Sequence, residues 1–132
     1  MSRLPRTLRA LSTLSAALLV TVGMSSAHAA NLNFLHDTPM SWMTQQDYDS
    51  LTHAVRDAVS NKADGEATKW SNEGLRNPVR IDATVTPTST EKDGDKTCRN
   101  TEVAINAKGQ TMTLRPRFCR TGSSAWVYQK PH

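Results

Sequence analysis

Apolar side chains recur at helical spacing in one stretch of the chain. Between Tyr48 and Val59 they return every three or four residues, which predicts an amphipathic helix from about Gln45 to Asn61. Thr44 and Asp47 occupy the two positions of a capping box at its N-terminal end. A helix with one apolar face has to cover another element, so we expect this helix to pack on a sheet.

Beyond Pro78 the period of the apolar residues changes to two. From Val79 to Pro87 apolar and polar residues alternate, which predicts a half-buried strand. Three further strands are expected near 97–106, 110–120 and 125–129. This single change of period predicts an α+β fold, in which one N-terminal amphipathic helix packs on an antiparallel sheet of about four strands.

Polar segments separate these predicted elements. Residues 66–78 are expected to be a connector, and Thr88–Lys96 a polar loop with its turn at Asp93-Gly94-Asp95. The last short turn is expected at Thr121–Ser124.

Cys98 and Cys119 are the only cysteines, and we expect them to form a disulfide. One antiparallel register places Cys98 opposite Cys119 and gives apolar residues apolar partners, Val103 with Leu114 and Ile105 with Met112. It leaves Asn106–Thr111 as the hairpin loop. Because side chains alternate between faces, the cysteines then point away from the Val103 face, unless a bulge near Pro116 intervenes.

The first residues have the three parts of a secretory signal. Arg3, Arg6 and Arg9 precede a short apolar run, and Ala27-His28-Ala29 resembles a cleavage site. We therefore expect a signal peptide at 1–29, a loose N-terminal arm at 30–43 and one domain at 44–132. The expected location is periplasmic or secreted, with no transmembrane segment after cleavage.

Charge argues against one class of partner. The chain has 16 basic and 12 acidic residues, but three arginines leave with the signal, so 13 basic residues remain against 12 acidic ones. Nucleic-acid binding needs a basic stripe, which this balance does not supply. The local cluster Arg115, Arg117 and Arg120 is expected to be a solvated strand face.

Several short motifs occur in an order that resembles a known family. They are Trp70-Ser71-Asn72 with Gly74, Cys98-Arg99, Val103-Ala104-Ile105 with Gly109, Phe118-Cys119-Arg120, and Gly122 with Trp126-Val127. This order is similar to the C-terminal domain of the rickettsial 17 kDa surface-antigen family, a group of bacterial envelope proteins. The resemblance spans residues 44–129 and implies an envelope location and a fold.

The chain departs from that family in one respect. Family members commonly carry a lipoprotein cysteine and a glycine-rich segment before this domain, and here the predicted signal leads directly into it. We therefore expect a periplasmic or released protein, or one peripherally associated with the outer membrane. The family has no well-defined biochemical activity, so the resemblance implies no reaction.

No residue pattern points to catalysis, and we expect no cofactor and no enzyme activity. His53 and Asp57 lie four residues apart on the predicted helix, but without a third ligand a surface pair is the simpler interpretation. No Gly-x-Ser-x-Gly motif is present. Glu91, Asp93 and Asp95 are interleaved with lysines, as in a solvated loop.

Four residues remain as structural or binding candidates: Arg99, Arg120, Trp70 and Trp126. The tryptophans, with Trp42, are expected to fill the core. Each arginine follows a cysteine, so both should lie on the sheet face opposite the disulfide. There they could bind an acidic partner or pair internally with Glu73, Asp82 or Glu102, and we expect internal pairing.

Two functions remain open from the sequence. The first is a non-enzymatic, surface-antigen-like envelope protein with a structural or interaction role and an unknown envelope partner. The second is a periplasmic inhibitor of an envelope enzyme such as lysozyme, which would present Thr88–Lys96 and Thr121–Ser124.

Overall fold

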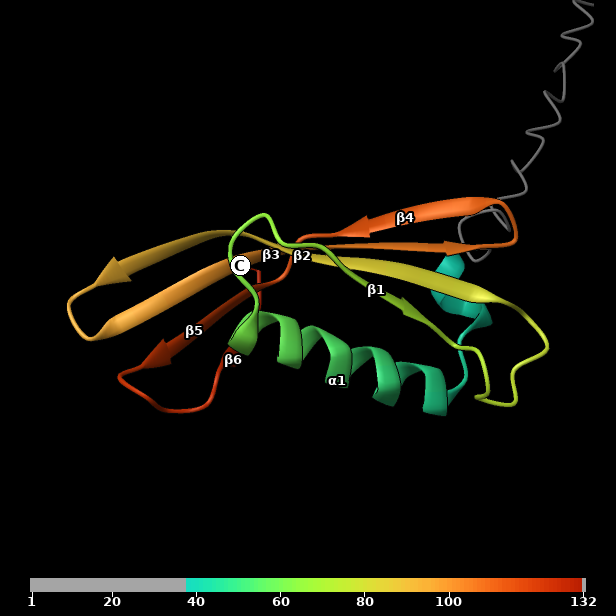
Figure 1. The fold of residues 1–132 in the computed structure, drawn as a ribbon, viewed down its shortest axis with the longest axis horizontal. Coiled ribbons are helices and arrows are strands. Elements are labelled where there is room, and N and C mark those ends of the chain that lie inside the picture. Colours follow the sequence, from blue (N-terminus) through green and yellow to red (C-terminus); the bar gives the residue numbers. More distant parts are fainter. Residues whose placement is uncertain (1–37, 132) are drawn as a thin grey trace, which may run out of the picture. The chain divides into compact units, whose positions relative to one another are not determined.

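A computed structural model of the chain describes residues 38–131. The predicted signal peptide and the first part of the predicted arm lie outside the described residues. Within them the chain forms one α-helix, α1, on a six-stranded sheet (Figure 1). The elements are η2 (Pro39–Trp42), α1 (Gln45–Asn61), β1 (Thr68–Ser71), β2 (Ile81–Asp93), β3 (Lys96–Ala107), β4 (Gln110–Leu114), β5 (Arg117–Thr121) and β6 (Val127–Gln129).

The helix prediction is confirmed at both ends, since α1 spans Gln45–Asn61. The Thr44 side chain accepts a hydrogen bond from the Asp47 backbone N–H, and the Asp47 carboxylate accepts one from the Thr44 N–H. This capping box satisfies donors that the first helical turn cannot pair within itself. Asp47 is buried, and the Asn77 side chain also donates a hydrogen bond to its carboxylate. This bond connects the N-terminal cap of α1 to the segment before β2.

The predicted fold class is wrong in its sheet, which has six strands where about four were expected. All strand pairs are antiparallel, and the order is β1-β2-β3-β5-β6, with β4 also paired to β3. The segment 66–78 contains β1, a strand too short to display an alternating pattern. The predicted strand 110–120 is interrupted at Arg115-Pro116, because proline cannot donate to the ladder.

Two predicted loops and the predicted arm also need correction. The polar segment Thr88–Lys96 is mostly strand, since β2 runs on to Asp93 and pairs there with Lys96. The β3–β4 connection is not six residues long: Ala107 pairs with Gln110, which leaves Lys108-Gly109 as a two-residue turn. Part of the arm forms the short helix η2, which contacts β3 and β4.

The predicted register is confirmed, with Cys98 opposite Cys119 and Val103 opposite Leu114. The disulfide between the two cysteines is present. The pairing offset is the same on both sides of Pro116, so no bulge occurs there. The cysteines therefore face away from the helix. The β3 residues that face α1 are Arg99, Thr101, Val103, Ile105 and Ala107, all buried.

The core lies between α1 and the middle of the sheet. Its buried members are small or aliphatic: Leu51, Ala58, Ile81, Ala83, Val85, Val103, Ile105 and Ala107. The helix packs mainly on β2 and also contacts β1 and β3 (Figure 1). Tryptophans do not form this core, contrary to the sequence expectation: Trp42 is exposed, and Trp70 packs at the margin.

One irregularity in the sheet positions the candidate site. The β2–β3 register shifts between Pro87 and Ser89, so a β-bulge lies at Thr88. After the bulge Thr90 is paired with Arg99 and shares its face of the sheet. The β2–β3 hairpin extends past the C-terminal end of α1 (Figure 1). The bulge therefore places polar residues of the hairpin next to the helix terminus.

Candidate functional site: a cavity at the C-terminal end of the helix

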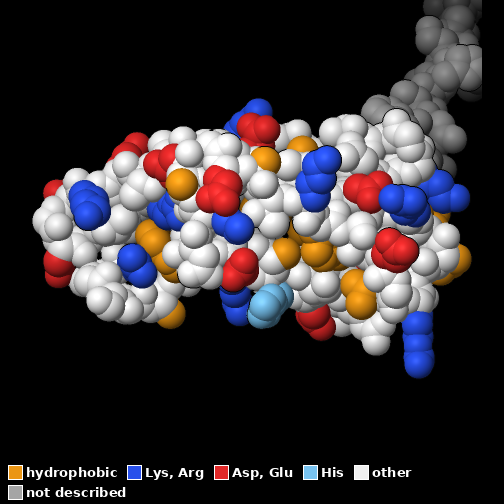
Figure 2. All heavy atoms as spheres, in the orientation of Figure 1, with side chains coloured by type: hydrophobic (Ala, Val, Ile, Leu, Met, Phe, Trp, Pro, Cys, Tyr) orange, Lys and Arg blue, Asp and Glu red, His pale blue; other side chains and the backbone are white. Residues whose placement is uncertain are grey.

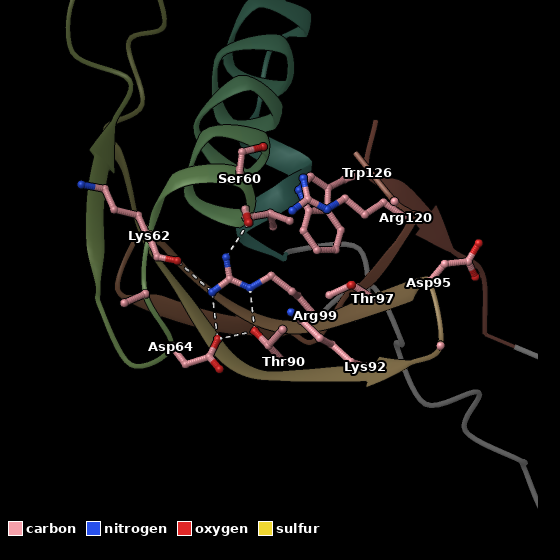
Figure 3. Close-up of a pocket in the computed structure, with 14 residues that line it drawn as sticks. Ser60, Lys62, Asp64, Thr90, Lys92, Asp95, Thr97, Arg99, Arg120 and Trp126 are labelled. Carbon is pink, nitrogen blue, oxygen red and sulfur yellow. Dashed lines mark hydrogen bonds and ion pairs between the residues drawn. The ribbon is translucent and has the colours of Figure 1, made fainter. Parts of the chain in front are cut away.

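A polar cavity lies where the end of α1, the tip of the β2–β3 hairpin and the β5–β6 connection meet. Its volume is about 560 Å³. Lys62 and Asp64 line it from the helix end, Lys92 and Arg99 from the hairpin, and Arg120 and Trp126 from the other side. Figure 3 shows Arg99 and Arg120 entering this region from neighbouring strands. Both arginines thus lie opposite the disulfide, as predicted.

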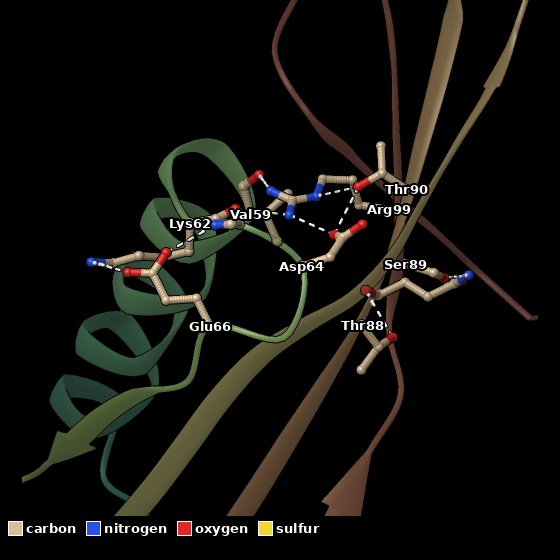
Figure 4. Close-up of polar contacts among 10 residues, drawn as sticks. Val59, Lys62, Asp64, Glu66, Thr88, Ser89, Thr90 and Arg99 are labelled. Carbon is tan, nitrogen blue, oxygen red and sulfur yellow. Dashed lines mark hydrogen bonds and ion pairs between the residues drawn. The ribbon is translucent and has the colours of Figure 1, made fainter.

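Arg99 connects strand β3 to the C-terminal end of α1. It is 7% exposed, and its Nη2 lies 2.8 Å from the Asp64 carboxylate. Its guanidinium also donates to the backbone carbonyls of Val59 and Lys62 and to the Thr90 hydroxyl (Figure 4). Carbonyls in the last helical turn have no partner within the helix, so this cation satisfies them and opposes the negative helix end. Arg99 is thus held by an internal ion pair and closes the end of the helix.

The carboxylate that pairs with Arg99 differs from the predicted ones. Glu73, Asp82 and Glu102 were the candidates, and Asp64 is the partner found. Hydrogen bonds from Arg99, and then from Thr90, hold the pKa of Asp64 below its usual value. The connector after α1 brings Asp64 to this position. No periodic pattern marks that connector, so the sequence could not identify this contact.

Arg120 has a different environment, and its predicted pairing with a carboxylate is wrong. Its guanidinium carbon lies 4.5 Å from the centre of the Trp126 ring, a cation–π contact. Within residues 38–131 no carboxylate forms an ion pair with it. Its Nε and the indole Nε1 of Trp126 are both buried and find no acceptor in this part of the chain. Two neighbouring donors are therefore left without partners beside one cavity.

The charge of the cavity wall is positive once the internal pairs are set aside. Arg99 is neutralised by Asp64, and Lys62 forms an ion pair with Glu66. Asp95 also lines the cavity, but Figure 3 shows its carboxylate directed away from Arg120. The remaining cations are Arg120 and Lys92, for which the described residues provide no ion pair.

Trp70 and Asn72, from the Trp70-Ser71-Asn72 motif, make contacts that hold the fold together. The Trp70 indole donates to the Ser50 hydroxyl on α1 at 3.0 Å, which connects β1 to the helix. Asn72 is buried, donates to the Val79 carbonyl and accepts from the Ile81 N–H. Its amide thereby closes the connection between β1 and β2. Among the motif side chains, Arg120 and Trp126 stand apart because their buried donors are unpaired.

No metal or catalytic cluster is found in the part of the chain that the structure describes. Nowhere in residues 38–131 do three His, Cys, Asp or Glu side chains converge. His53 is exposed on α1, and Asp57 accepts a hydrogen bond from Asn61. The residues lining the cavity include no histidine. On the face shown in Figure 2, basic and acidic side chains are interspersed and form no basic stripe.

None of the helices in residues 38–131 combines the length and apolar character that a membrane crossing requires. No protein-family model matches the chain, and no curated protein or solved structure is significantly similar to it. The resemblance to the surface-antigen family therefore rests on its sequence motifs.

Proposed function

We propose that this chain is an exported, non-enzymatic protein of the bacterial cell envelope, similar to the surface-antigen family, whose folded domain binds an envelope partner. The observation that carries the proposal is the Arg120–Trp126 pair at the wall of a cavity, whose two buried donors find no acceptor among the described residues. A structural pair would normally have its buried donors satisfied. Donors without acceptors are what a binding site presents before its ligand arrives.

Export is supported by the disulfide and by the signal-like N-terminus. Disulfides persist in oxidising compartments, and Cys98 and Cys119 are bonded across adjacent strands. The test is to express the full chain with a C-terminal epitope tag in a Gram-negative bacterium, fractionate the cells, and sequence the N-terminus of the product. We expect a processed chain in the periplasm or medium, beginning near Ala30, with both cysteines oxidised. An unprocessed cytoplasmic product with free thiols would contradict export.

Binding can be tested with the processed chain recovered from the periplasm. It should co-sediment with isolated cell envelopes, and Arg120→Gln should weaken the association. Arg80→Gln is the matched control, because Arg80 is an exposed arginine outside the cavity. Equal binding by wild type and Arg120→Gln would exclude the cavity as the binding surface, and no binding by either would contradict the proposed role.

One observation favours inhibition of an envelope enzyme as a second candidate. The two segments that an inhibitor would present lie together, because the Gly122 N–H donates to the Asp95 carbonyl at 2.8 Å. They form one protruding end that could enter an enzyme cleft. A lysozyme inhibition assay separates the two functions: nanomolar inhibition would establish the inhibitor, and no inhibition at micromolar concentrations would reject it.

A further inference from the structure

We infer that the cavity binds the free carboxylate of a peptide, through Arg120 supported by Trp126; this inference rests on the proposed function. The guanidinium carbon of Arg120 lies over the Trp126 ring, and this cation–π contact holds the cation at the cavity wall. Hydrogen bonds use the edge of a guanidinium, where its five N–H groups point. Trp126 therefore positions the cation without consuming a donor.

Within the described part of the chain, the donor edge of Arg120 has no hydrogen-bond partner. None of its nitrogens donates a hydrogen bond to a residue in the range 38–131. A buried donor without an acceptor is destabilising, and the indole N–H of Trp126 is a second such donor among the described residues. The other buried polar atoms without partners, on Asp47, Thr68 and Thr101, do not line this cavity. The terminal Nη1 and Nη2 of Arg120 are not among the buried atoms, so they are the donors that a ligand in the cavity would meet.

The surrounding charges favour an anion with a single negative charge. Arg120 and Lys92 form no ion pair within residues 38–131, Asp95 adds one carboxylate, and Asp64 is neutralised by Arg99, so the wall carries one net positive charge. Phosphate sites generally use helix N-termini or several converging backbone N–H groups. Here the helix presents its negative C-terminal end, which opposes a doubly charged phosphate more than a singly charged carboxylate. The guanidinium of Arg120 can hold both oxygens of a carboxylate, whose single charge matches the net charge of the wall.

The rest of the cavity suits the peptide that would carry this carboxylate. A volume of about 560 Å³ accommodates two or three residues. The hydroxyls of Ser60 and Thr97 line it and can accept hydrogen bonds from peptide N–H groups. The half-buried Trp126 ring also lines the cavity and offers an apolar contact for a small side chain.

The test uses the ¹⁵N-labelled processed chain and N-acetyl-alanyl-alanine as the probe, followed by NMR. The three tryptophans give three indole N–H signals, and Trp126→Phe identifies the one from Trp126. We expect the acid to shift the Trp126 indole and Arg120 Nε–H signals, and the C-terminal amide of the same peptide to shift neither. Arg120→Gln should weaken binding about tenfold or more, since a charge-assisted pair is lost. Arg80→Gln should leave the affinity unchanged.

Three outcomes would overturn the inference. The acid and the amide could shift the signals equally, or inorganic phosphate could bind more tightly than the acid. The acid could also cause no shift at about 20 mM, which would mean that its affinity is below that of a single weak ion pair. If the peptide does not bind while the processed chain still binds envelopes, the ligand class is wrong and the proposed function stands. If the chain is not exported or does not bind envelopes, the proposed function itself fails. Amide spectra and thermal melts of each variant show whether it is folded.

Discussion

The guanidinium of Arg99 lies 2.8 Å from the carboxylate of Asp64, just beyond the last turn of α1. The helix ends without the glycine cap that often closes helices, since Lys62 at its C-cap has extended backbone angles. Arg99 takes the place of such a cap by donating to the carbonyls of Val59 and Lys62. One side chain from the central strand β3 therefore closes the helix and fixes the connector that follows it.

Replacing Arg99 should destabilise the domain strongly. Arg99→Ala leaves the Val59 and Lys62 carbonyls without this donor and Asp64 without its cation, so we expect a loss of about 2–4 kcal/mol in the free energy of unfolding. Urea denaturation of the variant and the wild type measures it. Arg115→Ala is the control, because Arg115 is exposed and its Glu102 contact is 3.5 Å long; it should change stability by less than about 0.5 kcal/mol.

Arg120 should behave differently in the same measurement. Because its guanidinium contacts an aromatic ring and no described carboxylate, Arg120→Gln strands no partner charge. We expect a change within about 1 kcal/mol, the size of a partly exposed cation–π contact. A loss as large as that of Arg99→Ala would show that Arg120 is a structural residue after all.

Stability should fall in acid through Asp64. Its pKa is lowered in the folded state by hydrogen bonds from Arg99 and Thr90, so the unfolded chain binds the proton more readily. The stabilisation is complete above the unfolded pKa of about 4 and is lost as the pH drops through the lower folded pKa. Melting temperatures recorded from pH 6 to pH 2.5 should therefore decline below about pH 4. Asp64→Asn should make that decline shallower, and Asp93→Asn, at the exposed hairpin tip, should leave it unchanged.

The disulfide should contribute a large part of the stability. It links residues 21 apart in sequence, and the chain-entropy model assigns about 3 kcal/mol to a loop of that size. Reduction by dithiothreitol should lower the melting temperature by more than about 10 °C. The Cys98→Ser, Cys119→Ser double variant should melt at this lower temperature with or without reductant; if its melting temperature matched the oxidised wild type, the bond would contribute nothing.

Substitutions in the turn between β3 and β4 should affect stability only through the local backbone. Lys108 and Gly109 both have positive φ, the geometry that two-residue hairpins prefer. A Cβ at Gly109 would meet nothing within 4 Å, so only backbone strain opposes a substitution. Gly109→Ala should cost about 1 kcal/mol, and Gly109→Asn less, because asparagine tolerates positive φ. Equal losses in thermal denaturation would contradict this account of the turn.

Local patterns were sufficient for much of the fold. Helical spacing and the Thr44–Asp47 box located α1 to the residue, because both signals lie within a few positions of each other. The pairing of Cys98 with Cys119 and of Val103 with Leu114 followed from matching like partners across one hairpin. The strand count did not follow, because β1 is too short to show alternation and the predicted strand 110–120 is divided at Arg115-Pro116. The strand lengths did not follow either, because the distal part of the β2–β3 hairpin is exposed and polar and no alternation marks it as strand.

The candidate site was only half visible in the sequence. Side-chain alternation placed Arg99 and Arg120 on one face, because successive residues of a strand point to opposite sides. Their different environments depend on the tertiary structure: Asp64 is 35 residues from Arg99 in sequence and reaches it only because α1 packs on β2. Trp126 reaches Arg120 through the β5–β6 connection. The sequence by itself determined the helix, the disulfide and the faces of the strands, which are local or nearest-neighbour properties. How distant segments pack together decided that Arg99 is neutralised by Asp64, whereas Arg120 contacts Trp126 and no carboxylate of residues 38–131.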